Sequence, residues 1–575
     1  MEESPHITVP NLRFLISRKR RLLELLLSAL AGLAVSFTFS PLELTWLAWF
    51  ALIPLLALPV PMVRKRRVVI GFIFGAAYFV PSLFWLNEVG FGAGILLAVI
   101  CALFPMTWYL IFCTATVNFL VDRGTKNADA NIFPAIACLH GRSMRFAVSA
   151  FGLSALWVGL EWVRSWLFTG FPWNFLGVSQ WQNLGLLRIT TFTGVYGISF
   201  LIVLANFTLA WIFARWYKQF RRGHYTRKGE HWPVITALIC FALALLAIYR
   251  APELPEMADD TLVIAGIQGN LSQRREWSEE QLEEAIEVYD SLTRQALTDT
   301  EEDIDLVVWP ETAIPAAVQW EERSKRMLQR LFAEFDIPFL LGSIDYRPAS
   351  DSEDDYAQVN SAIYFGPDGQ VRDRYDKTHL VPFGEFVPLG DKLPWLRELI
   401  GMGRDLRAGQ QYTVINLPGE AEAGVNICYE DVFPYISRKF TRRGANLLIT
   451  LTNDAWYAKS SGSRQHMIHA VFRAAETRLP LFRSGNNSDT CLILPDGRVQ
   501  GLLYEESGND RFVRGFHVYK VPIWKNPPTT FYVQYGDLFA YINAFFGGLF
   551  IVYCGILFLR TTEKRWLVFN KSTTG

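Results

Sequence analysis

Charged residues are scarce in this 575-residue chain, and neither sign of charge dominates. Asp, Glu, Lys and Arg make up 19% of the residues, with 55 basic side chains against 55 acidic ones. A chain with no net charge lacks the basic surface typical of nucleic-acid binding, so we expect no nucleic-acid partner. Hydrophobic residues reach 51% and aromatic residues 14%, which is a composition typical of membrane proteins.

Several common functional motifs are also absent from the sequence. It has no glycine-rich phosphate loop, no Cys-x-x-Cys pair, no low-complexity tract and no long-period repeat. His466 and His469 lie three residues apart, but no third ligand stands in register with them. Two histidines alone are a weak indication of zinc, so core packing or solvent exposure is the favoured interpretation.

Long apolar runs, by contrast, are frequent. Most of them contain the ~20 predominantly apolar residues that cross a bilayer, and we predict about eight transmembrane helices. The predicted spans are Leu22–Phe39, Leu44–Val60, Val68–Leu86, Ala93–Leu120, Ala147–Phe168, Gly194–Ala214, Ile235–Tyr249 and Phe539–Leu559.

Basic residues are concentrated in alternate loops between these spans. RKRR precedes the first span (Arg18–Arg21) and follows the second (Arg64–Arg67), and basic residues recur after spans four, six and eight. The positive-inside rule then places both termini in the cytoplasm. Since seven spans precede residues 251–538, that segment is expected in the periplasm of a bacterium, with the spans in its inner membrane.

Residues 251–538 alternate between buried strand-like runs and amphipathic helical patterns, so we predict an α/β domain with a mixed sheet. The strand-like runs are residues 261–268, 305–310, 339–344, 423–428 and 446–453. Ser278 and Gln281 form a capping-box signature before one helix, and residues 464–478 form a second. Pro-Asp-Gly turns predict hairpins at 363–371 and 491–499. The predicted domains are 1–250, 251–538 and 539–575.

Three segments of this domain combine residues suited to nucleophilic catalysis. Cys428 ends an apolar strand in VNICYEDVF, and a cysteine nucleophile needs a base or a lowered pKa. Glu311 follows the buried run DLVVWP, at the strand end where α/β proteins keep their sites. Lys377 and Glu385 lie in the loop YDKTHLVPFGEFVP.

WPE, DKTHLVPFGEFVP and ICYED, in this order, resemble the nitrilase superfamily. With the membrane spans added, the chain resembles the apolipoprotein N-acyltransferase family over nearly its whole length, including GFPW, NDAWY and FRSGNN. The resemblance implies an α-β-β-α sandwich with Glu311, Lys377 and Cys428 as the catalytic triad. It also implies that neither a metal nor an organic cofactor is needed.

The resemblance further implies a two-step acyl transfer, and we expect the protein to act as a monomer. Cys428 would take an acyl chain from a membrane phospholipid, forming a thioester, while Glu311 serves as base and Lys377 stabilises the oxyanion. The α-amine of a diacylglyceryl-modified N-terminal cysteine on an apolipoprotein would then attack the thioester.

By the same resemblance, Glu385 would support the lysine and the intermediate, and Trp277 would help to hold lipid. Tyr429 and Glu430 directly follow Cys428, so we expect them to shape the substrate pocket. The loop at 458–464 departs from the family pattern, and its effect on substrate preference stays open.

Three residues near the fifth span are assigned to lipid contact. Phe171 and Trp173 in GFPW would lie at the outer interface, where they could equally be an anchoring belt. Arg164 could contact a lipid phosphate or extend its charge to the interface.

Other interpretations remain at this stage. Cys428 and Cys491 are the two cysteines of the predicted periplasmic segment and could form a disulfide. A membrane-tethered amidase would use the same triad with water as acceptor. A transporter would need ionisable residues within the spans, but the few candidates lie mostly at span ends: Glu24, Glu43, Glu88, Glu161 and Arg164.

Overall fold

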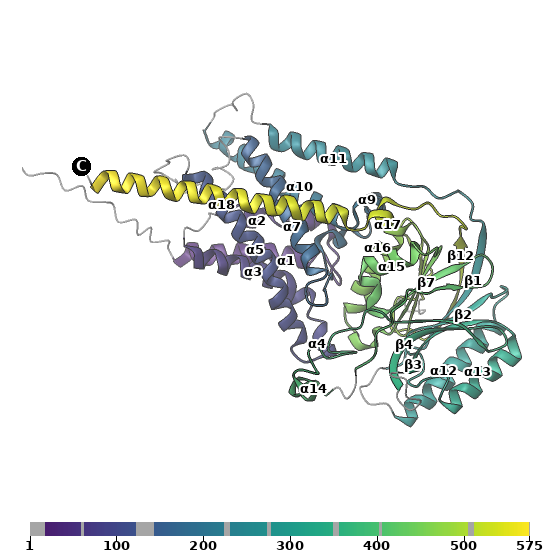
Figure 1. The fold of residues 1–575 in the computed structure, drawn as a ribbon. Helices are drawn as coiled ribbons and strands as arrows, with labels where there is room; N and C mark the ends of the chain where they lie inside the picture. The colour runs from purple at the N-terminus through teal and green to yellow at the C-terminus, as the bar shows by residue number, and fades with distance from the viewer. Residues whose placement is uncertain are drawn as a thin grey trace, which may run out of the picture.

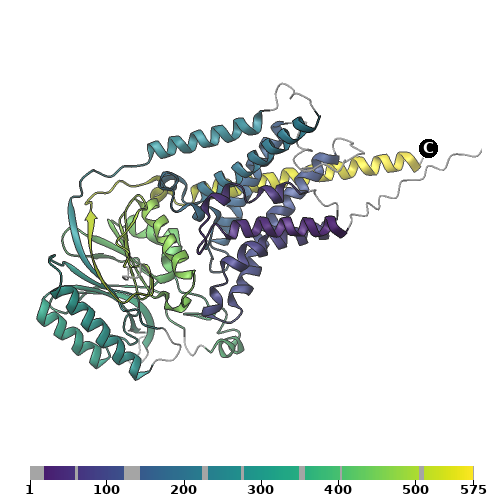
Figure 2. The same ribbon diagram turned by 180° about the vertical axis from the view of Figure 1, so that it is seen from behind.

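The computed structural model describes residues 18–58, 63–121, 143–222, 231–272, 278–348, 356–401, 405–503 and 511–573. A bundle of long helices lies on one side, and an α/β sandwich lies on the other (Figure 1). The reverse view shows the last helix returning from the sandwich into the bundle (Figure 2). Trp277 lies outside the described residues, so its predicted lipid contact is not seen.

Five of the described helices are long and apolar enough to cross a membrane, and they match predicted spans four to eight. They are α5 (Ala93–Val121), α7 (Ser143–Arg164), α10 (Tyr196–Arg222), α11 (Trp232–Arg250) and α18 (Leu538–Thr573). Short helices connect or flank them: α4 (Leu86–Val89), α8 (Leu184–Leu187), α9 (Thr190–Thr193), α17 (Phe531–Tyr535) and the 3-10 turn η2 (Leu176–Gln180).

The first three predicted spans look different. Helices α1 (Arg18–Ser36) and α3 (Arg64–Ser82) each contain 19 residues and begin with RKRR. The second predicted span is not one helix, because it divides into the 3-10 turn η1 (Thr45–Trp49) and α2 (Ile53–Leu56). Pro54 lies in the first turn of α2. Proline is tolerated there because its missing N–H is not needed, and it favours the start of a new helix over the continuation of an earlier one.

Helices α1 and α3 run parallel and in close contact. Ser28 Oγ donates to the carbonyl oxygen of Ile70 at 2.7 Å, and one turn further along each helix Gly32 lies against Phe74. A Cβ on Gly32 would lie 2.3 Å from the Phe74 carbonyl oxygen, so only glycine permits this approach. Because the two helices point the same way, the chain between them runs back along the bundle.

The sandwich consists of two six-stranded mixed sheets. The first has the order β12-β1-β2-β3-β4-β5, with strands β1 (Asp260–Gln268), β2 (Leu306–Trp309), β3 (Phe339–Pro348), β4 (Tyr356–Phe365), β5 (Val371–Asp376) and β12 (Gly515–Ile523). The second has the order β11-β10-β9-β8-β7-β6, with strands β6 (Val414–Asn416), β7 (Glu422–Ile427), β8 (Leu447–Thr452), β9 (Leu481–Gly485), β10 (Cys491–Ile493) and β11 (Val499–Gln500).

Alternating side chains of the first sheet face two different cores. Leu306 and Val308 of β2 pack toward the second sheet, whereas Val307 and Trp309 pack under α12 (Glu279–Thr298) and α13 (Glu322–Phe335). Ser278 caps α12 through the predicted capping box. Helices therefore cover the outer face of this sheet, and the predicted strands and both Pro-Asp-Gly hairpins are confirmed.

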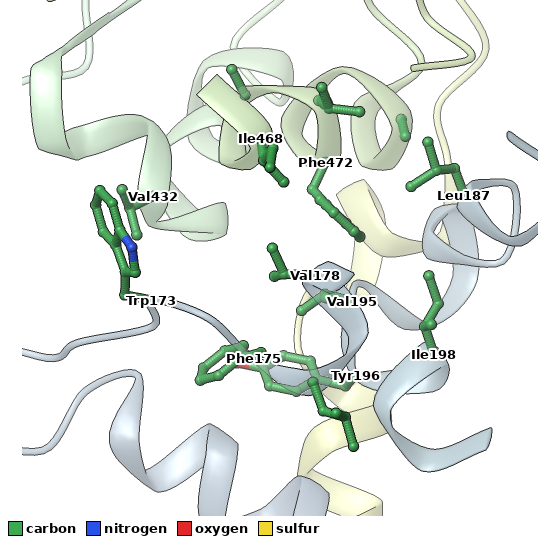
Figure 3. Packing of buried hydrophobic residues seen from close by; sticks show 14 of the residues in the cluster. Trp173, Phe175, Val178, Leu187, Val195, Tyr196, Ile198, Val432, Ile468 and Phe472 are labelled. Carbon is green, nitrogen blue, oxygen red and sulfur yellow. The ribbon is translucent and has the colours of Figure 1, made fainter. Parts of the chain in front are cut away.

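The second sheet is covered by α15 (Pro434–Thr441) and α16 (Gly462–Thr477), which complete an α-β-β-α sandwich. Helix α16 lies between the sheet and the helix bundle (Figure 1). Its Ile468 and Phe472 share one apolar cluster with Val178, Leu187 and Val195 from the bundle side (Figure 3). The two parts thus form a continuous core. The short α14 (Pro394–Ile400) and the 3-10 turns η3 (Cys428–Val432) and η4 (Asp454–Tyr457) complete the fold.

Candidate active site at the strand ends

Cys428 stands at a sharp turn between a buried strand and a 3-10 turn. It follows β7, and its φ of +52° lies in the left-handed region that residues other than glycine rarely adopt. Cys428 is 8% exposed. Such backbone strain at a buried cysteine points to a functional position. Cys428 and Cys491 are both free, so the alternative of a disulfide between them is wrong.

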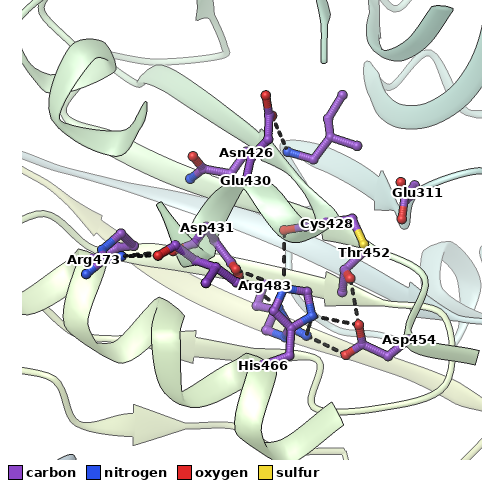
Figure 4. Close-up of polar contacts among 12 residues, drawn as sticks. Glu311, Asn426, Cys428, Glu430, Asp431, Thr452, Asp454, His466, Arg473 and Arg483 are labelled. Carbon is purple, nitrogen blue, oxygen red and sulfur yellow. Dashed lines mark hydrogen bonds and ion pairs between the residues drawn. The ribbon is translucent and has the colours of Figure 1, made fainter. Parts of the chain in front are cut away.

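Glu311 lies just beyond the end of β2, across from the cysteine (Figure 4). Its Oε1 accepts a hydrogen bond from Asn360 Nδ2 at 2.7 Å, and its Oε2 accepts one from the backbone N–H of Asn453 at 3.0 Å. Gly342 of β3 permits this packing, since a Cβ there would lie 2.5 Å from Glu311 Cα. The carboxylate is held in place by donors from two other segments.

Lys377 follows β5 and is buried between two carboxylates. Its Nζ lies 2.9 Å from Glu385 Oε1 and 3.4 Å from Glu311 Oε1, and its side chain is 1% exposed. Burial by itself would lower the pKa of Lys377, but Glu385 and Glu311 outweigh it and raise the pKa. The lysine is therefore a fixed positive charge.

The thiol of Cys428 is protonated in this resting arrangement. Burial, and next the negative charge of Glu311, raise its pKa well above the ordinary value, although Lys377 acts in the opposite direction. An uncharged thiol beside a carboxylate and an ammonium group suits a nucleophile that loses its proton only when it attacks.

Asn360 joins the two carboxylates, and the sequence interpretation missed it. Its Nδ2 donates to Glu311 Oε1 and also to Glu385 Oε1 at 3.0 Å. Glu385 Oε2 accepts from the backbone N–H of Val381 at 2.8 Å, which closes the PFGE loop around the lysine. The sequence signal that could have identified Asn360 is a polar residue within the apolar strand β4.

Glu430 lies behind the site rather than in the substrate pocket predicted for it. It is fully buried, and its carboxylate accepts five hydrogen bonds from Tyr375, Thr378, His379 and Ile427. Burial raises the pKa of Glu430, while these donors and Lys377 act against the rise. The contacts fasten the Lys377 loop to the turn that carries Cys428.

A second charged cluster lies on the other side of Cys428, and sequence analysis did not find it. Arg483 donates to Asp431 at 3.1 Å and to Asp454 at 2.6 Å, and His466 lies between the same two carboxylates at 2.9 and 2.8 Å (Figure 4). His466 Nε2 also lies 3.2 Å from the Cys428 carbonyl oxygen. We call these four residues the supporting cluster.

His466 is charged in this cluster. Burial lowers its pKa, but Asp431 and Asp454 outweigh burial and raise the pKa to about 9. Both ring nitrogens are engaged, so His466 has no free lone pair for a metal. His469 is also buried, and among the described residues no group of three or more His, Cys, Asp or Glu side chains is arranged to hold a metal ion.

Of the two aromatic residues predicted at the outer interface, Trp173 is buried against the site and Phe171 is half-buried beside it. Trp173 is fully buried, and its ring stacks on Phe171 and on Tyr429, each at 6.2 Å between centroids. Trp173 is therefore no exposed anchor. Tyr429 Oη lies 3.4 Å from the Gly170 carbonyl oxygen, so the residue after Cys428 contacts the segment after α7.

Arg164 likewise does not extend toward water. It is 5% exposed, and its Nη1 donates to the carbonyl oxygens of Trp173 at 2.7 Å and Phe171 at 3.2 Å. Its guanidinium lies over the rings of Phe79 and Phe175. In this arrangement Arg164 shapes the Phe171–Trp173 segment.

Gln465, next to His466, joins the bundle to the sandwich. Its Oε1 accepts from Trp85, Trp173 and Asn174 at 2.9–3.1 Å. Its Nε2 donates to the carbonyl oxygens of Ser40 at 2.8 Å and Ser82 at 3.1 Å. One buried amide thus connects three bundle segments to the helix that carries His466.

Comparisons with known proteins find family matches over most of the chain. The apolipoprotein N-acyltransferase N-terminal domain matches residues 31–208, and the carbon-nitrogen hydrolase domain matches residues 264–509. The apolipoprotein N-acyltransferase of Geobacter metallireducens is 33% identical over 529 residues, covering 90% of this chain and 92% of that protein.

A second relative and a solved structure extend the comparison. The apolipoprotein N-acyltransferase of Haemophilus ducreyi is 27% identical and covers 83% of this chain and 88% of its own length. An amidase of the nitrilase superfamily from Nesterenkonia is 15% identical, covers 47% of this chain and 94% of its own, and has a TM-score of 0.34.

Proposed function

Because the chain belongs to the apolipoprotein N-acyltransferase family, we propose that it moves an acyl chain from a membrane phospholipid to the α-amine of a diacylglyceryl-modified N-terminal cysteine on an apolipoprotein. The observation that carries this proposal is the buried Glu311–Lys377–Cys428 group, placed beside a bundle with membrane-spanning helices. We also propose that the protein acts as a monomer.

The first step forms a thioester. Glu311 takes the thiol proton as Cys428 Sγ attacks the ester carbonyl carbon, and Lys377 stabilises the resulting oxyanion. As the tetrahedral intermediate collapses, the ester C–O bond breaks, and Glu311 returns the proton to the departing lysophospholipid oxygen. The acyl chain remains on Cys428.

The charges of the site support Glu311 as the base. Before the step, two carboxylates flank one ammonium group. When the proton moves from Cys428 to Glu311, one carboxylate is neutralised and one thiolate is formed, so the net charge in the buried site is unchanged. A transfer of this kind avoids the cost of adding charge to a low-dielectric site.

The second step transfers the acyl chain to nitrogen. The acceptor amine attacks the thioester carbonyl, its extra proton passes to Glu311, and the C–S bond breaks to release the amide. Glu311 then returns the proton to the Cys428 thiolate. Because the donor product leaves before the acceptor reacts, the two lipid substrates need not occupy the site together.

We propose eight membrane crossings, with both termini in the cytoplasm of a bacterium and residues 251–538 in the periplasm. The parallel course of α1 and α3 supports this count, because a chain segment between two parallel helices must return across the same thickness. The RKRR sequences at the start of both helices support the orientation.

A reporter that is active only in the periplasm tests this topology. Fused at Asp355 it is expected to be active, and fused at Gly223 or after Thr573 it is expected to be silent. Activity at Gly223 with silence at Asp355 would invert the orientation and separate the site from its acceptor.

The activity itself is tested with the full-length protein in detergent. Incubation with phospholipid is expected to add one acyl mass to the peptide that contains Cys428. A diacylglyceryl-cysteinyl peptide should then discharge the adduct and gain the acyl chain. Discharge by water alone, with no acylated peptide, would instead identify a hydrolase.

A further inference from the structure

A groove opens beside the loop that carries Lys377, where the end of α7 meets the sandwich. Its walls include Trp166 and Phe168 from the segment after α7, Thr378 and His379 from the Lys377 loop, and Phe433 and Tyr435 after the nucleophile turn. Phe168 is 92% exposed and Trp166 is 50% exposed, so the mouth of the groove is apolar. The groove thus lies between the segment after α7 and the loop that carries Lys377.

His379 is rigidly held in the wall of this groove. Its backbone N–H donates to Glu430 at 3.1 Å, and its ring lies against Phe433 with centroids 3.9 Å apart. Its Nδ1 is 2.9 Å from Tyr435 Oη. Three contacts therefore fix the imidazole before any ligand enters.

The other ring nitrogen of His379 has no protein partner. Nε2 is buried and makes no hydrogen bond, although a buried polar atom without a partner is costly. The neighbouring Thr378 hydroxyl, in contrast, already bonds to Glu430 at 2.9 Å. Nε2 is thus a prepositioned and unsatisfied nitrogen on a side chain that lines an apolar groove, which is an arrangement typical of a ligand-recognition atom.

We propose that His379 Nε2 donates a hydrogen bond to an ester carbonyl oxygen of the glycerolipid donor in this groove. The proposal rests on the proposed function, and it adds a residue that determines how the donor is held. The proposal assigns Tyr435 Oη as the donor to Nδ1, because the imidazole proton then lies on Nε2.

The surroundings favour an ester over a phosphate. Among the described residues that line the groove there is no Lys or Arg, and Asp405 adds a carboxylate. Burial, and next the positive charge of Lys377, lower the pKa of His379 to about 4. A neutral N–H donor suits a neutral carbonyl oxygen, whereas an anionic phosphate would be drawn to basic side chains.

Two variants separate recognition from support. Asparagine at His379 keeps an atom near the position of Nδ1 and hence the contact with Tyr435, but it loses the distal nitrogen. Glutamine keeps a donor near the position of Nε2 and loses the contact with Tyr435. If Nε2 recognises lipid, H379N should weaken donor binding more than H379Q does. If the ring only supports the groove wall, H379N should not be worse than H379Q.

The test measures acyl-enzyme formation by the full-length protein in vesicles of phosphatidylethanolamine and phosphatidylglycerol. H379N is expected to raise the KM for donor about tenfold with little change in kcat, the size of one lost hydrogen bond, and H379Q should recover most of the loss. Equal effects of both variants, or a loss confined to kcat, would overturn the proposal.

A second donor distinguishes the ester from the phosphate. Diacylglycerol in detergent micelles without phospholipid retains the esters and lacks the phosphate, so the KM difference between H379N and wild type should persist with it. Disappearance of that difference would assign the contact to phosphate and overturn the ester assignment. Wild-type acyl-enzyme formation is measured in parallel, and its absence would refute the proposed function instead.

Discussion

Two charged clusters flank Cys428, and they differ in their ratio of carboxylates to cations. On one side, Glu311 and Glu385 share a single cation, Lys377. On the other, Asp431 and Asp454 share two, Arg483 and protonated His466. The first cluster has one carboxylate in excess, which can accept a proton. The second is neutral overall, so it has no excess carboxylate to accept a proton.

From this difference we propose that the first cluster carries out the chemistry and that the second keeps the site rigid. Glu311 can alternate between charged and neutral forms because Lys377 stays paired with Glu385 in both. In the supporting cluster, each carboxylate contacts both cations, so removing any member leaves an unpaired buried charge. Substitutions in the two clusters should therefore produce different patterns of lost activity and lost stability.

The largest effect is expected at the nucleophile between the clusters. Cys428→Ser should abolish transfer, by roughly 10³-fold or more, because a carboxylate base cannot ionise an alcohol of far higher pKa. The measurement is acylation of a lipopeptide by the full-length protein. Cys491→Ser, on the buried strand β10, is the matched control and should retain most activity. Equal losses in both would remove Cys428 from the mechanism.

The next largest effect is expected at Glu311. Glu311→Gln preserves shape but cannot accept the thiol proton, so acyl-enzyme formation should fall roughly 10²- to 10⁴-fold with little change in thermal stability. Mass spectrometry of the Cys428 peptide measures the adduct. Glu287→Gln, at an exposed position of α12, is the control and should react normally. An adduct that accumulates at the wild-type rate in Glu311→Gln would refute the base assignment.

A substitution in the supporting cluster should show the opposite pattern. Arg483→Met leaves Asp431 and Asp454 with His466 as their remaining cation, so we expect a loss of about 3–5 kcal/mol in the free energy of unfolding. Activity in the fraction that remains folded should fall by less than in Glu311→Gln. Thermal unfolding in detergent, followed with acyl-transfer assays on the folded fraction, checks both. Full stability with no activity would place Arg483 in the chemistry.

How far the sequence anticipated these clusters depended on the distance between partners along the chain. Cys428, Glu311 and Lys377 each follow a recognisable strand within a local motif, so they could be named from sequence. Asp454 and His466 also lie close together in sequence, but their partnership depends on Arg483 and on how β8, β9 and α16 pack. No local pattern encodes such packing.

The fold was anticipated to a similar degree. Buried strand runs, the capping box and the Pro-Asp-Gly turns are local signals, and all were confirmed. The second span was predicted as one helix from its hydrophobicity, which does not register that Pro54 starts a new helical segment. Gln465 was missed because its partner Trp85 lies 380 residues away in sequence.

The smallest effect concerns the pH dependence of the supporting cluster. The pKa of His466 rises from an ordinary value of 6.5 to about 9 in the folded protein. A raised pKa stabilises the folded state fully below the unfolded pKa, and this contribution is lost as the pH rises through the folded pKa. We therefore expect the melting temperature to fall by several degrees between about pH 6.5 and pH 9.

The variant His466→Asn isolates this contribution, because it cannot titrate there. Its melting temperature should be lower than that of the wild type at pH 6.5, and the difference should shrink toward pH 9. His517→Asn is the control. Because burial lowers the pKa of His517, its titration changes the stability at acidic pH and not at alkaline pH. The alkaline loss should persist in that variant. If His466→Asn and wild type lose stability in parallel, His466 is not the charged partner of Asp431 and Asp454, and the supporting cluster would carry the same excess of carboxylate as the catalytic one.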